Sequence, residues 1–265
     1  MIAIGLLLLV PFVMWCGQSL LLRLHGLPIR YRLDSGDAPR AVRTWGRVIT
    51  QGSILALIMA YPLLVQGQSP VAFYGAMLPI DGSLKLFAHG AAAATTCLCV
   101  LFAIWIATDR MRVDVHQSRR RWMRRLLLLP ATAVFGALAE ELLFRGVLFS
   151  DLLKTFSPSV TVVIGTLIFA SAHYVRAVKR WWTIGGHLAL GVLLGVSFLV
   201  TDRSLWLPVG LHAGGIMMIM GARPFVRYRG PAWLTGASIF PYAGVFGIVG
   251  LGVLTAFVAR YYGAS

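Results

Sequence analysis

Residues 126–150 read LLLLPATAVFGALAEELLFRGVLFS, an apolar stretch interrupted by two adjacent glutamates and one arginine. A run of about 18 or more apolar residues with few charges is long enough to cross a bilayer as a helix. The rest of the chain has the same character, since 58% of its 265 residues are hydrophobic and 12% are charged. Soluble domains carry roughly a quarter charged residues. The composition therefore excludes a soluble domain and predicts an all-α, polytopic membrane helical bundle.

Apolar stretches recur along the chain and predict about eight transmembrane helices. These are expected at residues 1–22, 48–66, 86–107, 126–150, 159–175, 184–200, 205–220 and 239–259. The first stretch is expected to remain as a helix, because it lacks the basic start and the small-residue cleavage site of a signal peptide. No internal repeat or linker is evident, so residues 1–265 are expected to form a single integral membrane domain.

The formal net charge of +15 comes from basic residues in short loops between the apolar stretches. If the chain changes side at every span, 19 of the 24 lysines and arginines fall on one side, in loops 23–47, 108–125, 176–183 and 221–238. The positive-inside rule makes this side cytoplasmic, with both termini facing outward. The charge thus indicates topology: we expect the lipid bilayer as a partner, no nucleic acid, and a location in a bacterial plasma (inner) membrane.

Ionisable residues at membrane depth are costly and therefore mark candidate functional sites. The chain contains only two glutamates, Glu140 and Glu141, and both lie inside the stretch 126–150. On an α-helix Glu141 and Arg145 lie about 40° apart and are expected to form an ion pair, whereas Glu140 lies roughly 140° from Arg145. We interpret Glu141 and Arg145 as a supporting pair and Glu140, which has no such cation, as a general base.

Histidines occur in three of the later spans, at His173, His187 and His212. With a rise of about 1.5 Å per residue, Glu140, His173 and His212 are expected at overlapping depths within the membrane. A glutamate and two histidines at this depth can hold and deprotonate a water molecule, with or without a metal. His187 and His89 are interpreted as packing residues.

Small residues repeat at four-residue spacing in the sixth and seventh spans. Gly191 and Gly195, and again Gly210 and Gly214, form small-xxx-small pairs that allow helix backbones to approach closely. Tight packing is therefore expected around these two spans.

The glutamates, the arginine and two of the histidines form a recognisable order along the chain. The pattern Glu140-Glu141-x-x-x-Arg145, then Phe169-x-x-x-His173, then His212 resembles the three motifs of the CPBP family, the CAAX-protease and bacteriocin-processing intramembrane proteases. The surrounding residues agree, with Phe144-Arg145-Gly146 after the glutamates and Ser204-Leu205-Trp206-Leu207-Pro208 before the last histidine. The resemblance covers roughly residues 126–220 and assigns no motif to residues 1–125.

The resemblance implies an intramembrane endopeptidase that hydrolyses membrane-anchored peptides or proteins. Glu140 would activate water alongside His173 and His212, with Glu141, Arg145 and Phe169 in support. The Phe169 ring, one turn before His173, is expected to pack against that imidazole.

One position departs from the family pattern, which often continues His-x-x-x-Asn with an asparagine that helps to form the oxyanion site. Here that position is Ile216, and the chain contains no asparagine. Either His212 and backbone N–H groups near Gly214 and Gly215 take over this role, or the activity is weak, or the protein is catalytically silent.

Two alternatives follow for the chemistry of the site. A zinc ion would take Glu140, His173 and His212 as ligands and keep an open position. A metal-free site is favoured, because zinc-ligating histidines usually have a carboxylate partner and Glu141 is expected to be committed to Arg145.

Two functions other than proteolysis are also compatible with the sequence. A non-catalytic membrane scaffold or chaperone would explain Ile216. A proton-relay transporter would use Glu140 and the histidines, although the inverted repeat common in such folds is not evident.

Overall fold

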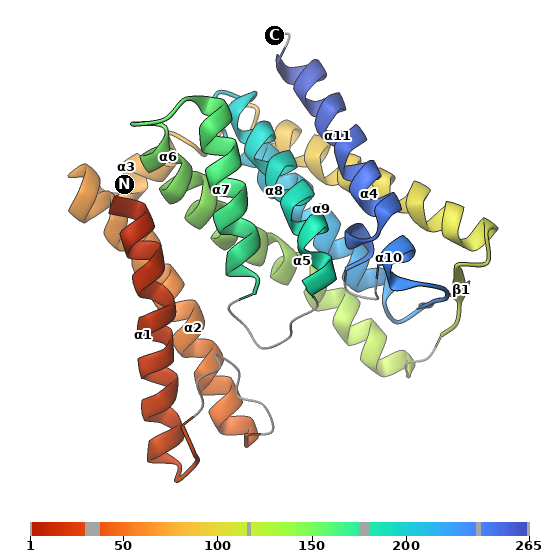
Figure 1. The fold of residues 1–265 in the computed structure, drawn as a ribbon, viewed down its shortest axis with the longest axis horizontal. Helices are drawn as coiled ribbons and strands as arrows, with labels where there is room; N and C mark the ends of the chain where they lie inside the picture. Colours follow the sequence, from red (N-terminus) through yellow and green to blue (C-terminus); the bar gives the residue numbers. More distant parts are fainter. Residues whose placement is uncertain (1, 30–37, 116–117, 175–180, 237–239, 264–265) are drawn as a thin grey trace.

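The computed structural model describes residues 2–29, 38–115, 118–174, 181–236 and 240–263. These residues form a bundle of helices (Figure 1). The long helices are α1 (Ile2–Leu24), α2 (Arg40–Tyr61), α4 (Ser83–Ala107), α5 (Arg119–Glu141), α7 (Pro158–Ala172), α8 (Ile184–Leu199), α9 (Trp206–Ala222) and α11 (Val245–Gly263). The short helices are α3 (Pro70–Gly75), α6 (Ser150–Leu152), α10 (Ala232–Thr235), the π-helices η1 (Pro62–Gln66) and η2 (Leu142–Phe149), and the 3₁₀ turns η3 (Trp181–Thr183) and η4 (Pro241–Ala243).

Two short strands are the only sheet within the described residues. β1 (Met111–Val113) and β2 (Val226–Tyr228) pair antiparallel, with Met111 opposite Tyr228. The strands follow α4 and α9, so the pairing joins the ends of these two helices outside the bundle (Figure 1).

A helix occupies each of the eight predicted stretches, and the expected all-α polytopic bundle is confirmed. Five segments are long and apolar enough to cross a bilayer, and these are Ile2–Leu24, Arg40–Gln66, Ser83–Ala107, Arg119–Leu152 and Val245–Gly263. Helices α7, α8 and α9 have only 15, 16 and 17 residues, fewer than the roughly 20 that an upright crossing needs. The number of eight spans therefore stays a prediction.

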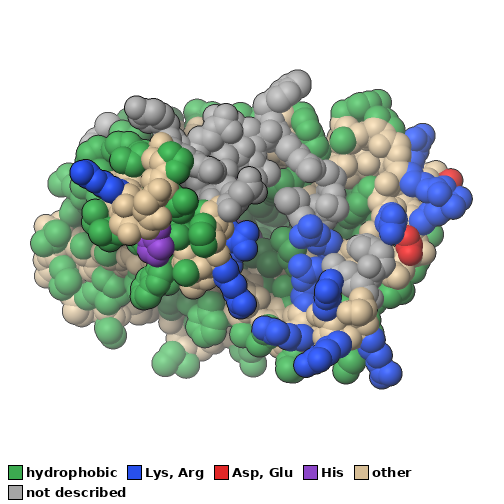
Figure 2. All heavy atoms as spheres, turned by 90° about the horizontal axis from the view of Figure 1, so that it is seen from below, with side chains coloured by type: hydrophobic (Ala, Val, Ile, Leu, Met, Phe, Trp, Pro, Cys, Tyr) green, Lys and Arg blue, Asp and Glu red, His purple; other side chains and the backbone are tan. Residues whose placement is uncertain are grey.

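The helix ends separate into two sides. In Figure 1, α1 begins and α11 ends on the upper side, and the chain leaves α1 and begins α5 on the lower side. Figure 2 looks at this lower face and shows lysine and arginine side chains spread across it. Part of the predicted basic side, including Arg176, Lys179 and Arg180, lies outside the described residues. The alternating topology stays a prediction.

Glycines allow α9 to lie directly against α4. A Cβ atom added to Gly214 would lie 2.6 Å from the carbonyl oxygen of Ala91, and one added to Gly90 would lie 2.7 Å from the amide nitrogen of Leu211. Both distances are shorter than real Cβ contacts, so only glycine fits at these positions. The tight packing predicted for the seventh span is present, and it fixes the position of the helix that carries His212.

Helix α8 is held closely in the same way. A Cβ on Gly195 would lie 2.8 Å from Cζ of Phe149, and one on Gly191 would lie 3.0 Å from Cγ2 of Thr166. Glycines at these positions let α8 pack against η2 and α7.

A buried aspartate connects the first two helices to the rest of the bundle. Asp151 of α6 accepts a hydrogen bond from the amide of Ala3 at 2.9 Å and one from the hydroxyl of Tyr61 at 3.3 Å. Gln66 donates to the same tyrosine oxygen at 2.7 Å. These bonds place α1 and α2 beside the segment that follows the two glutamates.

The sidedness of the bundle can be tested by cysteine labelling. On a background in which Cys16, Cys97 and Cys99 are replaced, Ser118→Cys lies on the basic face and Ser69→Cys on the opposite face, and both positions are exposed. With an impermeant thiol reagent on intact cells, we expect labelling at position 69 and none at 118. Labelling at 118 but not at 69 would reverse the orientation, and lysed cells provide the control in which both positions react.

Candidate active site

The helix changes its geometry directly after the two glutamates. Helix α5 ends at Glu141, and the chain continues without a break into the π-helix η2, which begins at Leu142. π-Helical turns are rare, and they occur frequently at functional sites. The change places Glu140 and Glu141 at a junction between two helical geometries, with Arg145 in the π-helical part.

The expected ion pair between Glu141 and Arg145 is present and buried. The Nη1 atom of Arg145 lies 3.1 Å from Oε2 of Glu141, and the two side chains are 1% and 0% exposed. Arg145 also donates from Nη2 to the carbonyl oxygen of Gly191 at 3.1 Å, and its guanidinium lies 4.9 Å from the ring centroid of Phe169. The arginine therefore connects η2 to α7 and α8.

Glu141 has a second partner that the sequence did not reveal. Its Oε1 atom lies 2.8 Å from Nδ1 of His212, which α9 brings to the glutamate from 71 positions away. The expectation that Glu141 is committed to Arg145 alone is wrong, and one argument against a zinc site falls with it. A carboxylate does orient one of the candidate histidines. No local pattern could have indicated this contact, because it depends on how α9 packs against α5.

His173 is oriented by its own helix. It caps the C-terminus of α7, and its Nδ1 lies 2.8 Å from the carbonyl oxygen of Phe169. A carbonyl oxygen only accepts hydrogen bonds, so Nδ1 carries the proton. The imidazole packs against the Phe169 ring, as expected, and against the His187 ring, each at a centroid distance of 4.6 Å.

The three candidate catalytic side chains lie together. Oε2 of Glu140 is 3.7 Å from Nε2 of His212 and 3.9 Å from Nε2 of His173. That oxygen is buried and has no hydrogen-bond partner among the described residues. When both histidines are neutral with Nδ1 protonated, their Nε2 lone pairs face the same carboxylate oxygen. A water molecule between them can donate to two of these acceptors, and protonation of Nε2 of His212 would turn the third into a donor.

The other two histidines inside helices have bonds of their own. His187 accepts from the Tyr242 hydroxyl at 3.2 Å through Nε2 and donates from Nδ1 to the carbonyl oxygen of Thr183 at 2.9 Å. His89 is bonded to the Tyr262 hydroxyl at 2.9 Å. These contacts agree with packing roles, although His187 also supports one side of the His173 ring.

A metal ion would need ligand atoms that converge on one point. Within the described ranges, no three His, Cys, Asp or Glu side chains are arranged so that they could hold a metal ion. The choice between a zinc site and a metal-free site stays a prediction, and no step of the chemistry below uses a metal.

Two cavities meet at Glu140 and His173. The first, of about 240 Å³, lies between α4, α8, α9 and α11 and also contains His212 and Ile216. The second, of about 600 Å³, lies between α1, α2 and α5 and is lined mainly by apolar side chains. The candidate general base is thus reached from both cavities.

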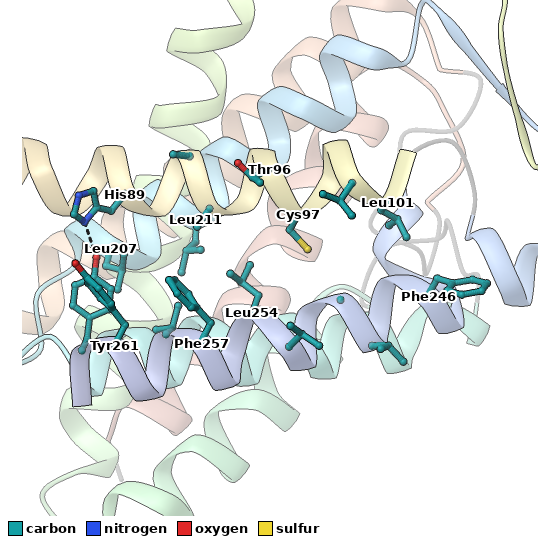
Figure 3. A pocket seen from close by; sticks show the side chains of 18 of the residues that line it. His89, Thr96, Cys97, Leu101, Leu207, Leu211, Phe246, Leu254, Phe257 and Tyr261 are labelled. Carbon is teal, nitrogen blue, oxygen red and sulfur yellow. Dashed lines mark hydrogen bonds between the residues drawn. The ribbon is translucent and has the colours of Figure 1, made fainter. Parts of the chain in front are cut away.

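A third, larger groove adjoins the first cavity. It occupies about 790 Å³ between α4 and α11, and Figure 3 shows Thr96, Cys97 and Leu101 on one side of it and Phe246, Leu254 and Phe257 on the other. Leu211, Leu254, Cys97 and Leu101 line both spaces. Apolar grooves therefore adjoin the candidate site.

The expectation that backbone N–H groups near Gly214 and Gly215 help to form the oxyanion site is wrong. Gly214 and Gly215 lie well inside α9, where backbone N–H groups are bonded to carbonyl groups four residues earlier. Only the first four N–H groups of a helix are free. The backbone near these glycines cannot supply the missing donor. His212 as the donor, weak activity and a catalytically silent protein remain as alternatives.

Removing the charge of Glu141 should destabilise the protein. In Glu141→Gln the buried guanidinium of Arg145 loses its counter-ion, and loss of one partner of a buried pair costs about 3–5 kcal/mol in the free energy of unfolding. The measurement is thermal or denaturant unfolding of the purified protein in detergent. Asp81→Asn, which removes an exposed carboxylate in a loop, is the control and should unfold like wild type. Equal stability of both variants would show that the pair is not buried.

Comparison with known proteins agrees with this geometry. Residues 122–218 match the family model described as type II CAAX prenyl endopeptidase Rce1-like. No curated protein and no solved structure matches the chain. The matched segment contains both glutamates, Arg145, His173 and His212, so the resemblance inferred from their order is confirmed. Residues 122–218 thus match the Rce1-like family of CAAX prenyl endopeptidases, and the chain is an integral, multi-pass membrane protein.

Proposed function

We propose that the protein hydrolyses peptide bonds of membrane-anchored substrates by glutamate-activated water. The observation that carries the proposal is the convergence of His173 and His212 on a single buried oxygen of Glu140. The family match over residues 122–218 supports an intramembrane endopeptidase, and the arrangement of these three side chains supports the mechanism.

The first step is activation of water. Separations of 3.7 and 3.9 Å between the Glu140 oxygen and the two Nε2 atoms are too long for direct hydrogen bonds and suit a bridging water. Glu140 removes one proton as the oxygen attacks the carbonyl carbon of the substrate. His173, whose ring is fixed through Nδ1, accepts a hydrogen bond at Nε2 from the other O–H group of the water and so orients the attacking oxygen.

The second requirement is a donor for the oxyanion. His212 fills this role when both ring nitrogens carry protons, since Nδ1 then donates to Glu141 and Nε2 donates to the developing negative charge. Arg145 is paired with Glu141 and holds its carboxylate in place, so the His212 ring does not reorient during the reaction. Loss of one oxyanion donor typically costs about 2.7–4 kcal/mol of transition-state stabilisation. Because Ile216 has no donor group, His212 would have to supply this stabilisation.

The last step is departure of the amine. The tetrahedral intermediate collapses, the carbon–nitrogen bond breaks, and Glu140 returns its proton to the leaving nitrogen. The glutamate is then ionised again and ready to accept a proton from the next water. No covalent enzyme intermediate is needed.

The surroundings of the site indicate the class of substrate. The cavities on both sides of Glu140 are lined mainly by apolar residues of membrane helices, which favours a peptide that is itself anchored in the bilayer. We place the enzyme in a bacterial plasma (inner) membrane, with the basic face of Figure 2 toward the cytoplasm.

A non-catalytic scaffold is the second candidate function, and Ile216 is the observation that favours it. This side chain lines the cavity with the three candidate catalytic residues and offers no donor to an oxyanion. A scaffold would bind membrane-anchored peptides without cleaving them, so detection of a cleaved product separates the two candidates.

Glu140→Gln should abolish hydrolysis and leave the fold intact. The substitution preserves shape and removes the base, and general-base catalysis contributes about 10²–10⁴-fold in rate. Turnover of membrane-anchored peptides is measured by mass spectrometry of the products, with unfolding temperature recorded in parallel and Asp81→Asn as the matched control. Wild-type turnover in Glu140→Gln would refute the assignment of the base.

Exhaustive chelation should leave the activity of purified protein unchanged, because the proposed steps use only side chains of this chain. Metal content is measured together with turnover. Stoichiometric zinc in active protein, with activity lost on its removal and restored on its return, would contradict the metal-free mechanism and make Glu140, His173 and His212 its ligands.

A further inference from the structure

The arginines on the basic face differ in whether they are paired. Arg112 and Arg229 lie 3.3 Å from oxygens of Asp109, and Arg227 lies 2.6 Å from an oxygen of Asp114. The hydrogen bond from Arg112 holds the pKa of the Asp109 carboxyl below its ordinary value. These three arginines beside the paired strands β1 and β2 therefore have carboxylate partners within the protein.

A second group, formed by Arg121, Arg124 and Arg125 at the start of α5, has no such partners. These three side chains make no ion pair and no side-chain hydrogen bond with any described residue. The Nη1 atom of Arg125 is nevertheless buried. A buried N–H group without an acceptor is unfavourable, so the group requires an acceptor from outside the chain.

The three arginines line a hollow with an apolar floor. Its volume is about 460 Å³, and its other lining residues are Leu128, Leu129 and Thr132 of α5 and Met220 of α9. Positions 121, 125, 128 and 132 are three or four residues apart, so they lie on one face of the helix. The three arginines line the end of the hollow near the start of α5, and Leu128 and Leu129 line its continuation along the helix.

Neighbouring aromatic rings indicate the depth of this hollow. Trp122 and Phe225 make an edge-to-face contact with ring centroids 5.3 Å apart, between the start of α5 and the segment after α9. Tryptophan is enriched at the level of the lipid headgroups. The guanidinium groups next to Trp122 therefore lie where phosphates of the inner leaflet are found.

We propose that this hollow binds one anionic phospholipid. Three unpaired guanidinium groups match the phosphate and the negative headgroup, since arginine donates to phosphate through two parallel N–H groups. Basic pockets between membrane helices on the cytoplasmic side are suited to such headgroups. The apolar floor formed by Leu128, Leu129 and Met220 distinguishes this ligand from free phosphate, because it accommodates the acyl chains.

The same face of α5 leads from the hollow to the candidate active site. Thr132 also lines the groove between α1, α2 and α5 that contains Glu140. Half a hydrocarbon core is about 15 Å, which corresponds to about ten residues of helix and reaches Phe135 from Arg125. The acyl chains of the bound lipid therefore end at the opening of this groove.

The test is retention of lipid by the full-length protein. Purified protein is stripped of lipid in detergent, mixed with phosphatidylglycerol or phosphatidylcholine, and examined by native mass spectrometry. The variant Arg121→Gln/Arg124→Gln/Arg125→Gln removes the site. The variant Arg112→Gln/Arg227→Gln/Arg229→Gln removes the same charge from the paired arginines on the same face and serves as the matched control.

We expect wild type and the control to retain one phosphatidylglycerol, with at least tenfold less retained by the site variant and by wild type offered phosphatidylcholine. Excess inorganic phosphate should not displace the lipid. Equal loss in both triple variants would show diffuse attraction rather than a site, and displacement by phosphate would assign the hollow to a soluble anion. Absence of retained phosphatidylglycerol in wild type would also overturn the proposal. None of these outcomes depends on proteolytic activity.

Discussion

The arrangement of this molecule depends on one buried carboxylate. Glu141 is fully buried and lies between Arg145 on its own helical segment and His212 on α9. Removing a charge from water is costly unless it is paired and hydrogen-bonded. Here Oε1 is hydrogen-bonded to His212 and Arg145, and Oε2 lies 3.1 Å from Nη1 of Arg145. Through Arg145 the same carboxylate is linked to the backbone of α8. Three segments far apart in sequence therefore meet at a single charge.

This connection determines which atoms face the neighbouring glutamate. Because Nδ1 of His212 is bonded to Glu141, its Nε2 is directed toward Glu140. The Nδ1 atom of His173 is bonded to the backbone carbonyl oxygen of Phe169, so the Nε2 atom of His173 is also directed toward Glu140. The close contact of α9 with α4 at Gly214 leaves no room for the ring to be displaced along with its helix. Unlike the two histidines, Glu140 is not held in place by a hydrogen bond to any described residue. Its side chain lies between two cavities.

Much of the fold and part of the site could be predicted from the sequence. Apolar length gave the position of each long helix, and the four-residue spacing gave the Glu141–Arg145 pair, because both depend on local geometry. The contact between Glu141 and His212 could not be predicted, since it joins residues 71 positions apart through helix packing. The π-helix after Glu141 also has no sequence pattern of its own. The predicted span 205–220 already placed Gly214 and Gly215 inside a helix, and α9 continues through both residues.

The central claim is that Glu141 and His212 act as one buried unit, and a double-mutant cycle on the free energy of unfolding tests it most directly. Contacting residues of one network show interaction energies of about 0.5–3 kcal/mol, whereas distant residues are additive. For Glu141→Gln, His212→Ala and the double variant, we predict that the double variant is less destabilised than the sum of the single variants. Strict additivity would contradict the account, because it would show that the carboxylate does not hold the histidine.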